Sequence, residues 1–93
     1  MIRTNRGKNE TVKLTFVLPG EEPAGRISVV GDFNDWRPGR HELRKRSNGT
    51  RSASVEVPSG TTVCFRYLGP DGHWFDDPDA HLNDHRGGLY RTS

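Results

Sequence analysis

Two tryptophans are the residues of this chain whose type and setting could do chemistry. Trp36 ends residues 31–36 (GDFNDW), and Trp74 lies within residues 71–78 (DGHWFDDP). Both segments are rich in Asp, Asn, Gly and Pro, which are typical of turns rather than of a buried core. We therefore expect two exposed rings, which together would form a platform for a flat ligand.

Composition limits what else the chain could be. Its 93 residues are 30% hydrophobic and 28% charged, and its net charge is +2. This length predicts one small domain with a modest core. The charge does not require a nucleic-acid partner, because it comes from basic and acidic residues that are mixed along the chain.

Apolar and polar residues alternate along most of the chain, as they do in strands with one buried face. In residues 61–68 the pattern turns Val63, Phe65 and Tyr67 inward and places Arg66 on the opposite face. The first ten residues lack such a pattern, so we expect a flexible segment at 1–10 followed by one domain at 11–93. The expected strands are 11–18, 26–33, 41–46, 51–57, 61–68, 73–75 and 89–92.

Short strands at this spacing, without helical periodicity, predict an all-β fold of six to eight strands. An immunoglobulin-like β-sandwich is the expected architecture, and a small barrel is the alternative.

Three segments together resemble a known family. They are residues 27–36 (ISVVGDFNDW), 65–68 (FRYL) and 71–78. The combination resembles the glycogen-binding, isoamylase N-terminal type of early-set domain, which is carbohydrate-binding module family 48. Such domains occur in glycogen branching and debranching enzymes and in the β-subunit of AMP-activated protein kinase. The likeness covers about residues 11–78.

The resemblance implies a sandwich that binds α-1,4-linked glucan, such as glycogen or a starch-like polymer. By this analogy Trp36 and Trp74 stack on sugar rings, Arg66 bonds to sugar hydroxyls between them, and Phe33 is a core residue.

The chain departs from the family pattern after Pro78. Family members that bind glucan carry a Leu-x-Thr-x-Asn type of loop there, whereas this chain has residues 86–91 (RGGLYR). Leu89 is the counterpart for the leucine and Asn83 for a polar position, although neither occupies a matched motif position.

Sugar chemistry agrees with this choice of residues. A pyranose ring has an apolar face of C–H groups and a rim of hydroxyls, so its site needs flat aromatic surfaces with hydrogen-bonding groups beside them. We expect the affinity to be weak, because an open platform buries little area and the oligosaccharide loses freedom.

A metal site or a glycosidase site would need a different arrangement. The chain has several acidic and histidine side chains in one region, but they show none of the recognised metal-ligand spacings. Hydrolysis would need two carboxyls across a deep cleft, which a small sandwich does not offer. We expect no metal, no cofactor, no catalytic residue and no enzyme activity. The residues considered are His73, Asp76, Asp77, Asp79, His81, Asp84 and His85.

Two function classes remain open at this stage. The first is non-catalytic glucan binding, with a polysaccharide or maltooligosaccharide as partner and a glucan-metabolising enzyme or another protein as a second partner. The alternative is a protein-interaction or scaffold domain that uses strand edges or the basic residues 44–46 (RKR) without binding sugar. Nucleic acid is not favoured as a partner.

The same reading predicts a cytoplasmic protein without a membrane partner. No apolar run approaches the roughly 20 residues that span a bilayer, and the basic N-terminus lacks the apolar middle of a secretory signal. The one cysteine, Cys64, cannot form an internal disulfide and is expected to be a structural strand residue.

Overall fold

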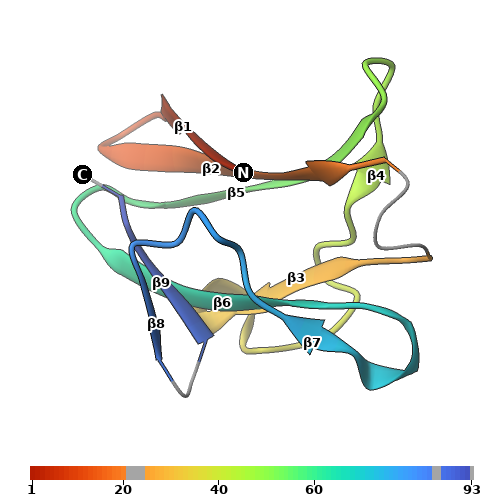
Figure 1. The fold of residues 1–93 in the computed structure, drawn as a ribbon. Helices are drawn as coiled ribbons and strands as arrows, with labels where there is room; N and C mark the ends of the chain where they lie inside the picture. Colours follow the sequence, from red (N-terminus) through yellow and green to blue (C-terminus); the bar gives the residue numbers. More distant parts are fainter. Residues whose placement is uncertain (21–24, 85–86, 93) are drawn as a thin grey trace.

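The computed structural model of the protein describes residues 1–20, 25–84 and 87–92. Two antiparallel sheets pack face to face, which confirms the predicted all-β sandwich and is consistent with an immunoglobulin-like fold (Figure 1). Nine strands are present in these residues, where six to eight were expected. No helix in these residues has the length and apolar character needed to span a membrane.

The first sheet has the strand order β1-β2-β5-β4, and the second has the order β3-β6-β9-β8, with β7 paired to β6. The strands of the first sheet are β1 (Ile2–Arg6), β2 (Thr11–Pro19), β4 (Arg44–Lys45) and β5 (Thr50–Pro58). Those of the second are β3 (Ser28–Gly31), β6 (Thr62–Leu68), β7 (Trp74–Phe75), β8 (Leu82–Asp84) and β9 (Gly87–Arg91). Two short 3₁₀ helices, η1 (Asp32–Asn34) and η2 (Pro70–Gly72), join strands.

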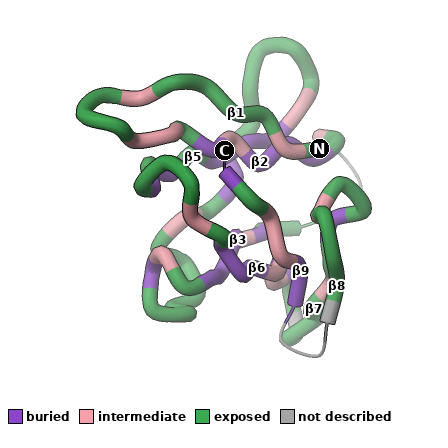
Figure 2. Tube along the Cα trace, turned by 90° about the vertical axis from the view of Figure 1, so that its left-hand side faces the viewer, coloured by how far each residue is buried: buried purple, intermediate pink, exposed green. Residues whose placement is uncertain are grey.

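An aromatic cluster fills the space between the sheets. The ring centroid of Phe16 in β2 lies 4.8 Å from that of Phe65 and 6.4 Å from that of Tyr67, both in β6. Phe33 is partly buried against the same core, with its centroid 5.8 Å from that of Phe16. The buried stretches in Figure 2 lie along the facing strands of both sheets. The predicted inward residues of the long strands are therefore core residues.

Two strands form where the sequence shows no apolar alternation. We predict structure from Thr11 onward, but β1 precedes it and pairs with β2 from Ile2↔Phe16 to Arg6↔Val12. Strand β8 pairs with β9 in a region predicted to be a polar loop. Both strands are held by backbone hydrogen bonds, which any residue type can form. Such pairing therefore needs no alternation of apolar residues in the sequence. His85 and Arg86 of the predicted loop lie outside the described residues.

The chain crosses between the sheets in the segment predicted as one edge strand at 41–46. Glu42 bridges to Ser28 of the second sheet, and the Leu43 N–H donates to the Ile27 carbonyl at 2.8 Å. From the next residue, Arg44, β4 pairs with β5 of the first sheet. Leu43 is buried at this crossing and anchors it.

A buried amide fixes the bend that follows β3. Asn34 accepts the Gly31 N–H on its Oδ1 at 3.0 Å, so its Nδ2 donates to the Val29 carbonyl at 3.1 Å and to His41 Nδ1 at 3.0 Å. The Trp36 N–H then donates to the Gly31 carbonyl at 2.9 Å. These bonds fix the course of the chain from β3 to Trp36.

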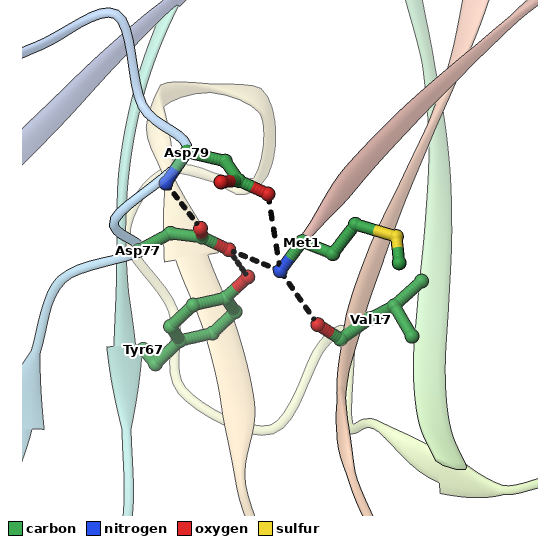
Figure 3. Close-up of polar contacts among 5 residues, drawn as sticks. All are labelled: Met1, Val17, Tyr67, Asp77 and Asp79. Atoms are coloured by element: carbon green, nitrogen blue, oxygen red, sulfur yellow. Dashed lines mark hydrogen bonds and ion pairs between the residues drawn. The ribbon is translucent and has the colours of Figure 1, made fainter.

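A buried carboxylate connects the second sheet to the start of the chain (Figure 3). Asp77 is 1% exposed and accepts the Tyr67 hydroxyl proton at 2.5 Å. Its other oxygen accepts the Asp79 N–H at 2.8 Å, and the Met1 ammonium group lies 3.2 Å from Oδ2. Burial and the adjacent Asp77 carboxylate raise the pKa of Tyr67, so the phenol remains a hydrogen-bond donor.

Replacing the Tyr67 hydroxyl should destabilise the fold. Tyr67→Phe leaves a buried carboxylate oxygen without one of its donors, and we expect the free energy of unfolding to fall by about 1–3 kcal/mol. The matched control is Tyr90→Phe, which removes a hydroxyl from a half-buried ring and should cost under about 0.5 kcal/mol. Urea denaturation measures both, and an equal effect of the two substitutions would contradict the role of Asp77.

The bend should make stability depend on pH. Burial, and after it the nearby Arg40, lower the pKa of His41 from its usual 6.5. The neutral ring can accept the Asn34 bond. The unfolded chain then binds more protons as the pH falls below about 6.5, so this part of the stability is complete above 6.5 and decreases below it. His41→Asn keeps an acceptor that does not titrate.

We expect the thermal midpoint of His41→Asn to fall less than that of the unmodified protein between pH 7 and pH 5. The control is His73→Asn, at an exposed histidine outside the bend, which should keep the full acid-induced decrease. If His41→Asn lost as much stability as the unmodified protein, protonation of His41 would not be the cause.

Candidate functional site

The outer face of β6 carries the side chains that alternate with the core. Val63, Phe65 and Tyr67 are in the core cluster, so Cys64, Arg66 and Leu68 belong to the opposite face. The Arg66 side chain is 32% exposed, whereas Cys64 is buried. Arg66 is thus the charged group at the middle of this face, on the side that sequence analysis predicts.

Strand β7 brings Trp74 to the same face. Trp74 pairs with Leu68, which shares the outward direction of Arg66, while the neighbouring Phe75 packs against the core. Trp74 is 40% exposed, and the Arg66 guanidinium carbon lies 5.9 Å from its ring centroid. This is within the distance for a cation–π contact. The structure therefore brings together two of the predicted site residues.

Asp76 holds Arg66 from its other side. The Arg66 Nε donates to Asp76 Oδ1 at 3.1 Å, and both side chains are about one-third exposed, at 32% and 36%. An exposed pair of this kind contributes little to stability, but it restricts where the guanidinium can lie. Sequence reasoning considered Asp76 only as a metal ligand or catalytic acid. The available signal was its position two residues after Trp74, because residues two apart in an extended segment point to the same face.

A glycine in β9 makes room for the stem of Arg66. A Cβ added at Gly87 would lie 2.5 Å from Arg66 Cγ and 2.7 Å from the Phe65 carbonyl oxygen. Gly87 also has a φ of +136°, which side chains rarely adopt. The departure from the family pattern at 86–91 thus includes a residue that shapes the space around Arg66.

Trp36 follows β3, which pairs with the edge of β6 opposite to β7. Leu68 pairs both with Ser28 of β3 and with Trp74 of β7, so β3 and β7 flank β6 on opposite edges. Trp36 follows β3 through the bend and is 38% exposed. Among the described contacts, none joins Trp36 to Arg66 or Trp74.

The backbone at Trp36 is in an unusual conformation. Asp35 and Trp36 both have a φ of 56°, the left-handed region that bulky residues rarely adopt. Strain of this kind in a folded protein concentrates at functional sites. The sequence predicted a bend at this position, but it gave no sign of the left-handed tryptophan.

The two remaining predicted residues lie on strands β8 and β9. Leu89 pairs with Cys64, which places it on the outer face beside the row of Arg66. Leu82 pairs with Leu89 and is 60% exposed, so it extends this apolar margin, a role that sequence reasoning missed. Asn83 is exposed and pairs with Gly88, which in turn pairs with the inward Phe65. Its direction therefore differs from that of Arg66.

The acidic and histidine residues of this region have separate partners. Asp76 pairs with Arg66, and Asp77 pairs with Tyr67. His81 accepts the Arg91 N–H on Nδ1 at 3.1 Å and stacks on Tyr90. In the part of the chain that the structure describes, no three His, Cys, Asp or Glu side chains form a group that could hold a metal ion. The predicted candidate His85 lies outside that part.

Comparison with known proteins finds similarity to glucan branching enzymes. Over 50 residues the chain is 62% identical to the 1,4-alpha-glucan branching enzyme GlgB 2 of Xanthomonas campestris pv. campestris (strain 8004) and 46% identical to GlgB of Rhodopseudomonas palustris (strain BisB5). Each match covers 53% of this chain and 7% of the enzyme. The GlgB enzyme of Synechococcus elongatus is 30% identical over 59 residues, which are 62% of this chain and 8% of the enzyme.

No family model matches the chain. The matched part of the chain spans less than a tenth of these relatives, at 7–8% of their length. The finding is therefore a likeness to one region of glucan-related enzymes, carried by an all-β sandwich domain.

Proposed function

We propose that this chain is a non-catalytic domain that binds α-1,4-linked glucan on the outer face of its second sheet. The observation that carries the proposal is the Arg66 guanidinium, which lies 5.9 Å from the exposed Trp74 ring on an open strand face. A flat ring beside a multiple hydrogen-bond donor is what a sugar with an apolar face and a polar rim requires.

Each proposed contact has a distinct task. Trp74 stacks on one glucose ring, and the free N–H groups of Arg66 donate to hydroxyls at its edge. Asp76 keeps the guanidinium over this position through its bond to Nε. Trp36, on the opposite edge of β6, stacks on a further glucose of the same chain.

Of the two residues on strands β8 and β9, Leu89 belongs to the margin of the proposed site. Leu89 is half-buried on the outer face, where it offers apolar area next to the exposed Leu82. Asn83 is exposed in strand β8, but its side chain shares the direction of Phe65, so we leave it out of the proposed contacts. Leu89 should therefore add apolar contact with the sugar beside the stacking rings.

Two further observations support a glucan rather than another flat ligand. The relatives with the matched region act on α-1,4-glucan, as their names state. The sequence segments around Trp36 and Trp74 also resemble carbohydrate-binding module family 48, to which we propose the domain belongs.

A binding role also fits the chemistry of this face better than catalysis. Hydrolysis or transfer of a glycosidic bond uses two carboxyl groups on opposite sides of the bond. Asp76 is already engaged by Arg66, and Asp77 is 1% exposed beneath Tyr67. The proposed domain therefore holds glucan without reacting with it.

Removing either ring should weaken glucan binding. We expect maltoheptaose at millimolar concentration to shift the indole N–H signals of both tryptophans in a nuclear magnetic resonance titration. Trp36→Ala and Trp74→Ala should each reduce the affinity by about tenfold, since each loses roughly 60 Å² of stacked apolar area at ~25 cal/mol per Å².

The conservative variant and a second sugar serve as controls. Trp74→Phe should retain part of the affinity, because a smaller flat ring remains. A cello-oligosaccharide of equal length tests the linkage, since its β-linked chain presents its rings differently. Unshifted indole signals at millimolar maltoheptaose, with a folded spectrum, would refute the proposal.

Separate variants can test the Arg66 side chain itself and the bond from Asp76 that holds it. Arg66→Gln should lower maltoheptaose affinity about fivefold or more, because a donor to the sugar is lost. Asp76→Asn should lower it less, since Arg66 remains but moves more freely. Arg3→Gln removes the same charge on the other sheet and should leave the affinity unchanged.

A double-mutant cycle decides whether Asp76 acts through Arg66. If it does, adding Asp76→Asn to Arg66→Gln should have little further effect on affinity. Independent, additive losses in isothermal titration would show that Asp76 contacts sugar by itself or has no positioning role.

A further inference from the structure

The outer face of the first sheet has a floor of small hydroxyl side chains. Ala53, Val55 and Val57 of β5 point into the core, so Ser52 and Ser54 point outward. Ser54 pairs with Thr15 of β2, and their hydroxyls are hydrogen-bonded at 2.9 Å. Because these positions carry no large side chain, the surface of the sheet is low next to its edge strand β4.

Arginines surround this floor on the side of β4. Arg44 pairs with Ser52, so its side chain belongs to the outer face, and Arg46 donates from Nε to Ser52 Oγ at 2.8 Å. A second bond runs from Arg46 Nη2 to the Ser52 carbonyl at 3.3 Å. Together with Arg40 they line an open groove of about 460 Å³, whose wall also includes Ser54.

The positive charge of the groove is not neutralised within the fold. Among the described residues, Arg40, Arg44 and Arg46 take part in no ion pair. One carboxylate, that of Glu42, lines the same groove. Three guanidinium groups against one carboxylate leave a surplus of positive charge.

We propose that this groove docks an acidic segment of a protein partner. Guanidinium groups pair with carboxylates through two parallel N–H···O bonds. Arg40 and Arg44 can make such pairs, and Arg46, held by Ser52 through Nε and Nη2, adds its charge beside them. The exposed Ser54 hydroxyl can donate to the same carboxylates. This function goes beyond glucan binding and does not depend on it.

The shape and composition of the groove favour a protein segment over other anions. It is lined by Arg, Ser, Glu, His, Gly and Ala and has no aromatic ring apart from His41, so it lacks the stacking surface that single-stranded nucleic acid uses. It is also open and exposed, so a single small anion would stay hydrated. A chain with several carboxylates can engage all three arginines at once.

The two proposed sites lie on opposite layers of the sandwich. Arg44 and Arg46 lie at β4, and Trp74 and Arg66 lie in β7 and β6. Strands β4 and β5 belong to one layer and β6 and β7 to the other (Figure 1). A protein partner and a glucan could then occupy the domain at the same time. The domain would connect an acidic protein to the polysaccharide.

The test is a titration of the isotope-labelled full chain with a hexaglutamate peptide. We expect amide shifts at Arg44, Arg46, Ser52 and Ser54, unchanged indole signals, and an affinity that decreases with salt. The variant Arg40→Gln/Arg44→Gln should lose about fivefold in affinity, because two exposed ion pairs are removed. Arg46 is left intact because it also bonds within the fold.

A charge-matched variant and two other anions decide between the explanations. Arg6→Gln/Lys8→Gln removes the same charge from the exposed β1 end and should bind hexaglutamate as the unmodified chain does. Equal losses in the two variants, or no shifts in the groove at millimolar peptide, would overturn the proposal. So would tighter binding of a hexathymidine oligonucleotide at the same residues, or shifts of equal size with inorganic phosphate alone. Failure here leaves maltoheptaose binding untouched, so the two proposals are tested independently.

Discussion

Strand β6 is the constraint on which both the core and the candidate site depend. It lies inside the second sheet, with β3 along one edge and β9 and β7 along the other. Because successive side chains of a strand point to opposite faces, burying Phe65 and Tyr67 obliges Arg66 to lie outside. A shift of one residue would bury a guanidinium and expose two aromatic rings, at a cost of several kcal/mol. The packing of the core thus fixes the position of Arg66 on the outer face.

Alternation is also why so much of the fold could be predicted. Period-2 patterns predict the inward residues of β2, β5 and β6 and the outward direction of Arg66. The family resemblance predicts the core position of Phe33. The exposure of Trp36 and Trp74 agrees with their turn-rich surroundings. In each case the responsible interaction is local in sequence, or it is the burial of a whole strand face. Both leave a signal in a single chain.

The features that could not be predicted depend on contacts between distant segments. The bond of Asp77 to Tyr67 gives no pattern, and Asp next to Pro is ordinary in a turn. Strand β1 and strand β8 pair through their backbones, which any sequence can do. Asp76 becomes the anchor of Arg66 only when β7 lies along β6, and the arginine groove exists only because β4 joins the first sheet after the chain crosses from the second.

The residue type at Trp36 is not set by the hydrogen bonds of the bend in which it lies. A left-handed backbone costs a non-glycine residue about 1–2 kcal/mol, and a glycine at this position would avoid that cost. The Asn34 hydrogen bonds fix the bend, and the Trp36 N–H bond to Gly31 uses the backbone alone, so neither needs an indole ring. The ring does not recover the strain by full burial either, since 38% of the residue is exposed. The hydrogen bonds of the bend therefore do not account for a tryptophan at this strained position, and an exposed ring here agrees with the stacking role proposed for it.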